Sequence, residues 1–237
     1  MKPAEITAIF DQQASGYDQQ WRKMAPLNGA LHLLVKSTLS QLGPQARIIC
    51  VGAGTGAEIV ALAAEFPEWH FTAVEPSLPM LDVFRRKAEE HGISDRCIFH
   101  GGYLDTLPIG QPYDAATSFL VSQFLTDRTQ RSNFFREIAS RLHSAGILVT
   151  SDLTGDMSSP KCELLIEQWF QLMRGGGISP EGIEKMREAY SSDVAVLPAD
   201  DVEEIIIQGG FELPVKFFQA GMVQAWFAKK SIRPSHQ

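Results

Sequence analysis

Residues 48–59, IICVGAGTGAEI, carry three glycines at alternate positions directly after a run of apolar residues. The apolar, β-branched stretch 47–52 predicts a buried strand, and the spacing of residues 57–66 predicts a helix. In a strand-to-helix turn, glycines permit a tight bend, the approach of a ligand to the backbone and close packing of the helix on the strand. The stretch therefore predicts a ligand-binding turn after the first strand of an α/β sheet.

The rest of the chain continues this alternation of strands and helices. Further strands are predicted over residues 70–76, 97–102, 113–121 and 147–153, and helices over residues 77–92, 126–146 and 199–210. Two closing strands, 211–218 and 221–230, are joined by a short turn and have the pattern of a hairpin. The predicted fold class is α/β, a Rossmann-like doubly wound sheet of seven strands. Five of these are parallel, and a C-terminal antiparallel hairpin completes the sheet.

Two helical regions lie outside the alternation. The first, residues 1–42, has helical spacing with a break near Pro26 and Gly29. The second, residues 153–198, holds two helical segments that each open with a Ser-Pro pair, and proline is favoured in the first helical turn. We expect a single domain over residues 1–237, in which the first region is an N-terminal lid and the second a cap inserted after the fifth strand.

Composition limits the classes of function. The 237 residues include 28 acidic and 21 basic side chains, for a net charge of −7, which argues against wide nucleic-acid contacts. No apolar run is long enough to span a membrane, and the first residues lack the pattern of a secretory signal, so we expect a cytoplasmic protein. Three scattered cysteines have no metal-ligand spacing, and no metal site is expected. A homodimer is compatible with the sequence.

The glycine turn fits two classes of ligand. Residues 52–57 satisfy the pattern G-x-G-x-x-G/A, and Glu75 follows Gly56 by 19 residues, at the end of the second predicted strand. An acid at that position can accept both ribose hydroxyls of NAD or of S-adenosylmethionine (SAM). The sequence contains no Tyr-x-x-x-Lys pair of short-chain dehydrogenases and no P-loop. The choice between NAD and SAM therefore depends on the order of the strands and helices.

That order, with a hairpin after five parallel strands, resembles the class I SAM-dependent methyltransferases of the small-molecule type. The resemblance covers about residues 10–229 and rests on seven short segments in the same order and spacing. They are FDQQASGYD, VGAGTGAE, VEPSLPML, GGYLDTLP, YDAATSFLVSQFL, RLHSAGILVTSDL and QGGFE. The resemblance implies an enzyme that uses SAM as its cofactor and transfers the methyl group to a small-molecule acceptor by in-line displacement.

The resemblance also implies a set of cofactor-binding residues. They are Gly52, Ala53, Gly54 and Gly56 in the turn; Glu75, Pro76, Ser77 and Met80 after the second strand; Gly102, Tyr103 and Leu104 after the third; Ser118 and Phe119 after the fourth; and Tyr17 in the lid. Candidate substrate residues are Gln123, Trp169 and Tyr190, and no catalytic base is identified. Two positions depart from the family, since Cys50 and Tyr103 stand where aspartates are usual, and Asp105 is near enough to replace the second.

Three other functions remain open at this stage. One is an NAD-dependent oxidoreductase. A second is an enzyme of the same fold that forms carboxy-SAM for tRNA modification, because LVSQFL and the helix after it resemble that group. This reaction would require a basic residue for the added carboxylate, and Arg174 and Arg187 are available in the cap. The third is a SAM-binding sensor without turnover.

Overall fold

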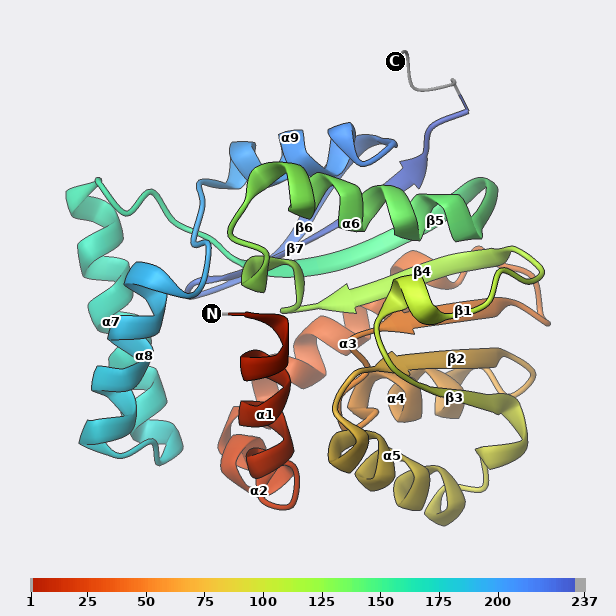
Figure 1. Cartoon of the computed structure of the whole chain (residues 1–237), viewed down its shortest axis with the longest axis horizontal. Coiled ribbons are helices and arrows are strands. Elements are labelled where there is room, and N and C mark those ends of the chain that lie inside the picture. The colour runs from red at the N-terminus through yellow and green to blue at the C-terminus, as the bar shows by residue number, and fades with distance from the viewer. Residues whose placement is uncertain (1, 233–237) are drawn as a thin grey trace.

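The computed structural model describes residues 2–232 and contains one seven-stranded sheet with helices on both faces (Figure 1). The strands are β1 (Arg47–Val51), β2 (His70–Glu75), β3 (Cys97–Gly101), β4 (Tyr113–Phe119), β5 (Leu142–Leu153), β6 (Phe211–Ala220) and β7 (Val223–Lys230). Their order is β3-β2-β1-β4-β5-β7-β6; the first five pair in parallel, and β7 and β6 add the antiparallel hairpin. The predicted fold class is confirmed.

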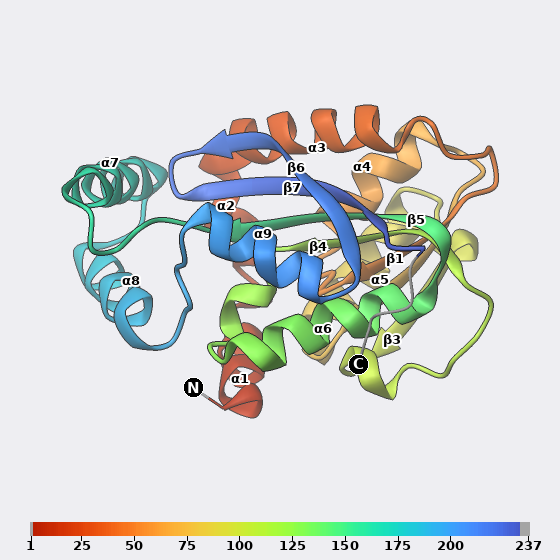
Figure 2. The same cartoon turned by 90° about the horizontal axis from the view of Figure 1, so that it is seen from above.

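The helices form two layers and a separate pair. They are α1 (Pro3–Gln13), α2 (Tyr17–Trp21), α3 (Ala25–Leu39), α4 (Ala57–Glu65), α5 (Leu78–Glu90), α6 (Arg128–Arg141), α7 (Pro160–Gly176), α8 (Pro180–Ser192) and α9 (Ala199–Gln208), with short 3-10 turns η1 (Arg22–Met24), η2 (Ser94–Arg96), η3 (Leu104–Thr106) and η4 (Ser122–Phe124). Helices α3, α4 and α5 cover one face of the sheet, and α6 and α9 cover the other (Figure 2). Helices α7 and α8 stand beside the end of the sheet (Figure 1).

The start of each cap helix follows from its sequence. The hydroxyl oxygens of Ser159 and Ser179 accept hydrogen bonds from the backbone of Lys161 (3.3 Å) and Gly182 (3.1 Å), and a proline follows each serine. These are standard helix N-caps. The pair packs in one buried cluster with residues of η1, β5 and the start of β7. Division of the chain into a lid, a core and a cap within one domain stays a prediction.

The predicted break near Pro26 is confirmed: η1 ends at Met24, and Pro26 falls in the first turn of α3, where a missing N–H leaves no hydrogen bond unmade. A second break, at Ala14–Gly16, was not predicted. One predicted boundary was wrong. Helix α6 ends at Arg141 and β5 begins at Leu142, because the chain pairs with Tyr113 before a register shift that includes Ala145 at φ +64°.

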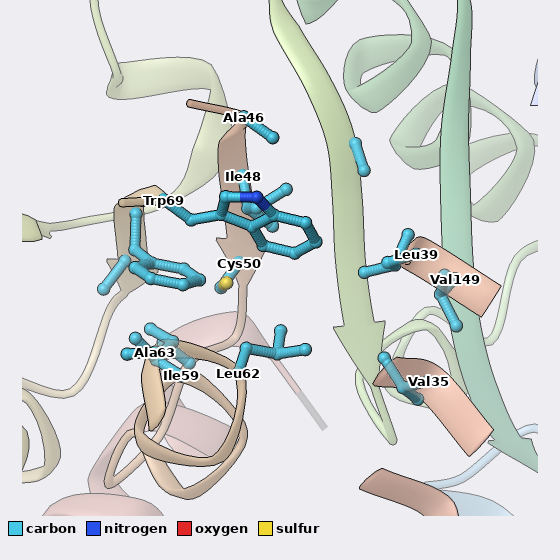
Figure 3. Packing of buried hydrophobic residues seen from close by; sticks show 14 of the residues in the cluster. Val35, Leu39, Ala46, Ile48, Cys50, Ile59, Leu62, Ala63, Trp69 and Val149 are labelled. Carbon is cyan, nitrogen blue, oxygen red and sulfur yellow. The ribbon is translucent and has the colours of Figure 1, made fainter. Parts of the chain in front are cut away.

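The side chain of Cys50 lies inside the core beneath the glycine turn. Figure 3 shows it between α4 and the indole of Trp69, among Ile48, Ile59 and Leu62. It is fully buried, and burial raises the pKa of its thiol well above the usual range. The cysteine therefore packs in the core, where its thiol also forms hydrogen bonds with Thr117 and Glu58.

Glu58, in the first turn of α4, supplies a carboxyl group to the same region. The Thr117 hydroxyl donates a hydrogen bond to Glu58 Oε1 at 2.5 Å. Burial raises the pKa of Glu58 to about 7, although hydrogen bonds from Thr117 and Cys50 act in the opposite direction. A carboxyl group thus lies beside β1, supplied by the helix α4 and in contact with β4.

Among residues 2–232, no helix is both long and apolar enough to cross a membrane. The same part of the chain contains no cluster of three or more His, Cys, Asp or Glu side chains that could hold a metal ion.

Glu58→Gln should change how stability depends on pH. Because the folded protein holds the Glu58 proton to about pH 7, wild-type stability should fall as pH rises from the unfolded pKa of about 4.5 toward 7. Glutamine keeps the acceptor for Thr117 without the titration. We expect similar unfolding free energies at pH 4.5 and an advantage of about 1–3 kcal/mol for the variant at pH 8. Urea unfolding at both pH values measures this.

The matched control is Glu68→Gln, which changes an exposed acid. The control should show the same difference from wild type at both pH values. An equal difference for Glu58→Gln at pH 4.5 and pH 8 would contradict the raised pKa.

Candidate functional site

A cavity of about 640 Å³ opens where the carboxyl ends of β1, β2 and β4 meet. Its wall comes from the glycine turn, the residues after β2 and β3, helix α1, Tyr17, the connection after β4 and helix α6. In parallel α/β sheets, ligands bind at this edge, beside the point where the strand order reverses. The volume lies within the range of about 300–1,000 Å³ typical of small-molecule sites.

The three glycines of the turn have different surroundings. All three have positive φ, of +75° at Gly52, +54° at Gly54 and +73° at Gly56. A Cβ at Gly56 would overlap the ring of Phe84 in α5, so this glycine permits close packing of helices. A Cβ at Gly54 would meet no atom within 4 Å, and the residue lines the cavity. Gly54 is therefore where a ligand can approach the backbone most closely.

Glu75 joins this turn to the end of β2. Its Oε2 accepts a hydrogen bond from the Gly54 backbone at 2.8 Å, and its Oε1 accepts one from the Ser77 backbone at 2.9 Å. The residue is 6% exposed and lines the cavity. Burial raises its pKa, while the two backbone donors act against the shift. Each carboxylate oxygen keeps a lone pair that a ligand's hydroxyl group can use.

Most of the other predicted cofactor residues also line the cavity. Pro76 and Met80 follow Glu75, and the loop after β3 contributes its predicted residues Gly102, Tyr103 and Leu104. Phe119 adds an aromatic surface from the end of β4. Together they give the cavity an apolar wall on both sides of the carboxylate.

Helices α1 and α2 close one side of the cavity through side-chain contacts, α1 with two loops and α2 with a third. The Thr7 hydroxyl lies 2.9 Å from the hydroxyl of Tyr103. The Ser77 hydroxyl donates to Asp11 at 2.6 Å. Beyond the helix, the Thr55 hydroxyl donates to Asp18 at 2.7 Å, and Lys87 pairs with the same carboxylate at 2.5 Å. The N-terminal segment thus lies in a closed position over the glycine turn.

Tyr17 lies in the cavity wall beneath this segment. Its ring centroid is 6.4 Å from that of Phe10 and 6.2 Å from that of Trp21. Burial raises the pKa of Tyr17 to about 12, and the charges of Glu75 and Asp18 add to the shift. Tyr17 is therefore a neutral phenol at physiological pH, able to donate a hydrogen bond but unsuited to act as a base.

Four predicted cofactor residues lie behind the cavity wall rather than in it. Ala53 accepts the backbone hydrogen bond of Gly56, which shapes the turn. Ser77 caps α5 by accepting a hydrogen bond from Met80 at 3.3 Å. Ser118 is buried in the sheet, where its carbonyl accepts a hydrogen bond from Thr150. These residues, with Gly56, hold the wall in place.

The candidate substrate residues do not line this cavity. Gln123 is buried, and its side-chain oxygen accepts a hydrogen bond from the Leu153 backbone at 3.1 Å. Trp169 donates to the Tyr190 hydroxyl at 3.0 Å, so these two residues join α7 to α8 inside the cap. Burial raises the pKa of Tyr190 to about 12. The polar side-chain atoms of these residues form hydrogen bonds within the fold, and a substrate role for them stays a prediction.

A wall that the sequence analysis missed comes from α6 and α1. Gln130, Asn133, Phe134 and Glu137 line the cavity from α6, and Phe10 lines it from α1. The polar stretch DRTQRSN at the start of α6 has no recognisable motif. Only the position of the helix against the loop after β3 brings it to the cavity.

A buried ion pair fixes α6 and η4 beside this wall. Arg131 and Asp152, both fully buried, are 2.7 Å apart. The Ser122 hydroxyl donates to Asp152 at 2.6 Å, and Arg131 also donates to the carbonyl of Ala195, after α8, at 3.1 Å. Burial raises the pKa of Asp152, and Arg131 opposes the shift. The pair thus connects β5, α6 and the end of the cap.

Comparisons with known proteins agree with this geometry. Residues 48–146 match the family model described as a methyltransferase domain. Over 225 residues, the chain is 23% identical to the carboxy-S-adenosyl-L-methionine synthase of Campylobacter hominis. The alignment covers 95% of this chain and 92% of that protein.

Two solved structures show the same fold. One is an O-methyltransferase family 2 protein from Planctomyces limnophilus in complex with apigenin; the TM-score is 0.62 at 14% identity, over 97% of this chain and 62% of that one. The other is PigF with SAH; the TM-score is 0.57 at 18% identity, over 78% of this chain and 50% of that one. The chain thus spans about half to two thirds of the length of these structures.

Alanine at two of the glycines should have separable effects. Gly54→Ala adds a methyl group in open space, so the only strain comes from the positive φ. The free energy of unfolding should fall by about 1–2 kcal/mol. Gly56→Ala adds overlap with Phe84, so the loss should be greater by about 1–3 kcal/mol. Urea unfolding of both variants measures the difference. Equal losses, or a greater loss for Gly54→Ala, would contradict the assigned roles.

Proposed function

We propose that this chain, a member of the class I SAM-dependent methyltransferases by its domain match and its fold, binds SAM in the cavity and methylates a small-molecule acceptor. The observation that carries the proposal is the position of Glu75. Its carboxylate is fixed by the backbone of Gly54 and Ser77, and it faces a cavity large enough for a nucleoside ligand. An acid at the end of the second strand is suited to accept the ribose hydroxyls.

The residues present fit the rest of this ligand. Gly54 leaves room beside the backbone, and Met80 and Tyr103 offer apolar surface for an adenine ring. SAM carries two positive groups and one carboxylate, so it is a net cation. The described residues of the cavity wall include the acids Glu75, Asp105 and Glu137 and no lysine, arginine or histidine. A wall of this charge favours a cationic ligand.

When bound, SAM would supply an electrophilic methyl group: the acceptor atom would form a bond to the methyl carbon in line with the carbon–sulfur bond, which breaks as SAH leaves. The residues of the wall would contribute mainly by positioning, which can lower a barrier by about 7–11 kcal/mol. Tyr17 and Phe119 border the cavity and can fix the orientation of the two reactants. Since Tyr17 remains protonated, an acceptor that must lose a proton would rely on one of the carboxylates or on its own acidity.

A second candidate, formation of carboxy-SAM, is favoured by the relative from Campylobacter hominis, which aligns with 95% of the chain. The structure weighs against it, because the described wall has no cation for the added carboxylate. Arg187 pairs with Glu167 at 2.8 Å and lies over the ring of Phe170, and Arg174 is an exposed residue of α7. Neither lines the cavity, so methyl transfer is the better-supported reaction.

Calorimetric titration with SAM, its demethylated product SAH and NAD tests the cofactor. We expect SAM and SAH to bind and NAD not to bind. Gly54→Val should abolish binding by filling the space at residue 54, and Glu75→Ala should weaken it about tenfold or more by removing two charge-assisted hydrogen bonds.

Glu68→Gln, on the surface, should bind like wild type, and an unfolding curve for each variant separates lost binding from lost folding. Binding of NAD alone would contradict the proposal. Release of SAH on incubation of SAM with a panel of phenols, amines and thiols would then distinguish an enzyme from a sensor, for which no acceptor would give turnover.

A further inference from the structure

We infer that the part of the cavity between α1 and α6 is the acceptor site, and that it takes an uncharged aromatic molecule and excludes anionic ones. The inference rests on the proposed function, because it assigns to SAM the part of the cavity beside Glu75 and Gly54. The remaining wall differs from that part in its aromatic content and in its uncharged polar groups.

Aromatic rings form the inner surface of this site. Phe10 of α1 and Phe124 of η4 meet edge to face, with their ring centroids 5.7 Å apart. Tyr17 lies 6.4 Å from Phe10, and Phe119 and Phe134 line the same cavity. These rings come from the lid, from the end of β4, from η4 and from α6, so aromatic surface reaches the cavity from several elements. Offset and edge-to-face contacts of this kind favour an aromatic ligand.

The charges around the site exclude an anion. Of its two acids, Asp105 is exposed and has no cationic partner among the described ion pairs. Glu137 is paired with Arg141 at 2.8 Å. The Arg141 guanidinium also donates to the carbonyl of Leu104 at 2.8 Å, and it is buried behind the wall rather than exposed in the cavity. An anionic acceptor would lose water and gain no cationic side chain from the described wall.

The polar groups at the mouth of the site suit a neutral ligand. Thr126, Gln130 and Asn133 line it with one hydroxyl and two amide groups. Asn133 accepts a hydrogen bond from Arg136. The Arg136 guanidinium also donates to the carbonyl of Gln208 in α9 at 3.2 Å, and Arg136 does not line the cavity. Amides and hydroxyls both donate and accept, so they can orient a phenolic hydroxyl or an amide without preferring a charge.

Two probes of nearly equal shape test the inference. Protein saturated with SAH is titrated with 4-hydroxyphenylacetamide and with 4-hydroxyphenylacetate, which differ chiefly in the charge of the side chain. We expect the amide to bind about tenfold more tightly or better, since the carboxylate would be desolvated without a cation. Equal binding, tighter binding of the acid, or no binding of either probe to protein that holds SAH would overturn the inference.

A gain of function gives an independent check. Gln130→Lys places a cation at the mouth of the site and should raise affinity for the acid, so that the preference for the amide falls severalfold. Gln168→Lys adds the same charge on the exposed face of α7 and should leave the preference unchanged. If both variants changed the preference equally, overall charge rather than this site would be responsible, and the inference would be wrong.

Binding of SAH itself is measured first with wild-type protein. If SAH fails to bind, the proposed function fails, and the inference fails with it. If SAH binds and the probes do not discriminate, only the inference fails.

Discussion

The hydrogen bond from the Gly54 backbone to Glu75, 2.8 Å long, is the contact on which the arrangement of the site depends. It joins residues 21 apart in sequence, and it forms because β1 and β2 are parallel neighbours with Val51 opposite Val74. The Val74 carbonyl also accepts hydrogen bonds from Gly52 and Ala53. The turn is therefore fixed to β2 before any ligand binds, and such preorganisation reduces the entropy lost on binding.

The two departures from the family's pattern are linked to other parts of the fold. Cys50 lies in the apolar core (Figure 3). Glu58 of α4 forms a hydrogen bond with the Cys50 side chain. Tyr103 contacts Thr7 of α1 through its hydroxyl, so a residue beside the cavity also holds the N-terminal segment in place. Asp11 and Asp18 add contacts with the loops after β2 and β1. The closed position of the lid thus depends on the loops that border the cofactor site.

Sequence patterns predicted those features that arise from local geometry. The alternation of elements, the glycine turn, the position of Glu75 and the Ser-Pro starts of the cap helices all depend on a few consecutive residues or on strand order. The α6 wall of the cavity has no such local signal, because Gln130 and Glu137 line it only through the packing of α6 near η3. The hydrogen bond between Trp169 and Tyr190, which joins α7 to α8, also has no local sequence signal, because it depends on how the two helices pack.

A crystal structure of the protein with SAH would test the central claim most directly. We expect both ribose hydroxyls to donate to Glu75 and the adenine ring to lie between Met80 and the loop at Tyr103. The sulfur should point toward Tyr17 and Phe119. The cavity between Phe10, Phe124 and α6 should then remain free for an acceptor. A ribose bound away from Glu75, or SAH occupying the α6 side of the cavity, would contradict the account.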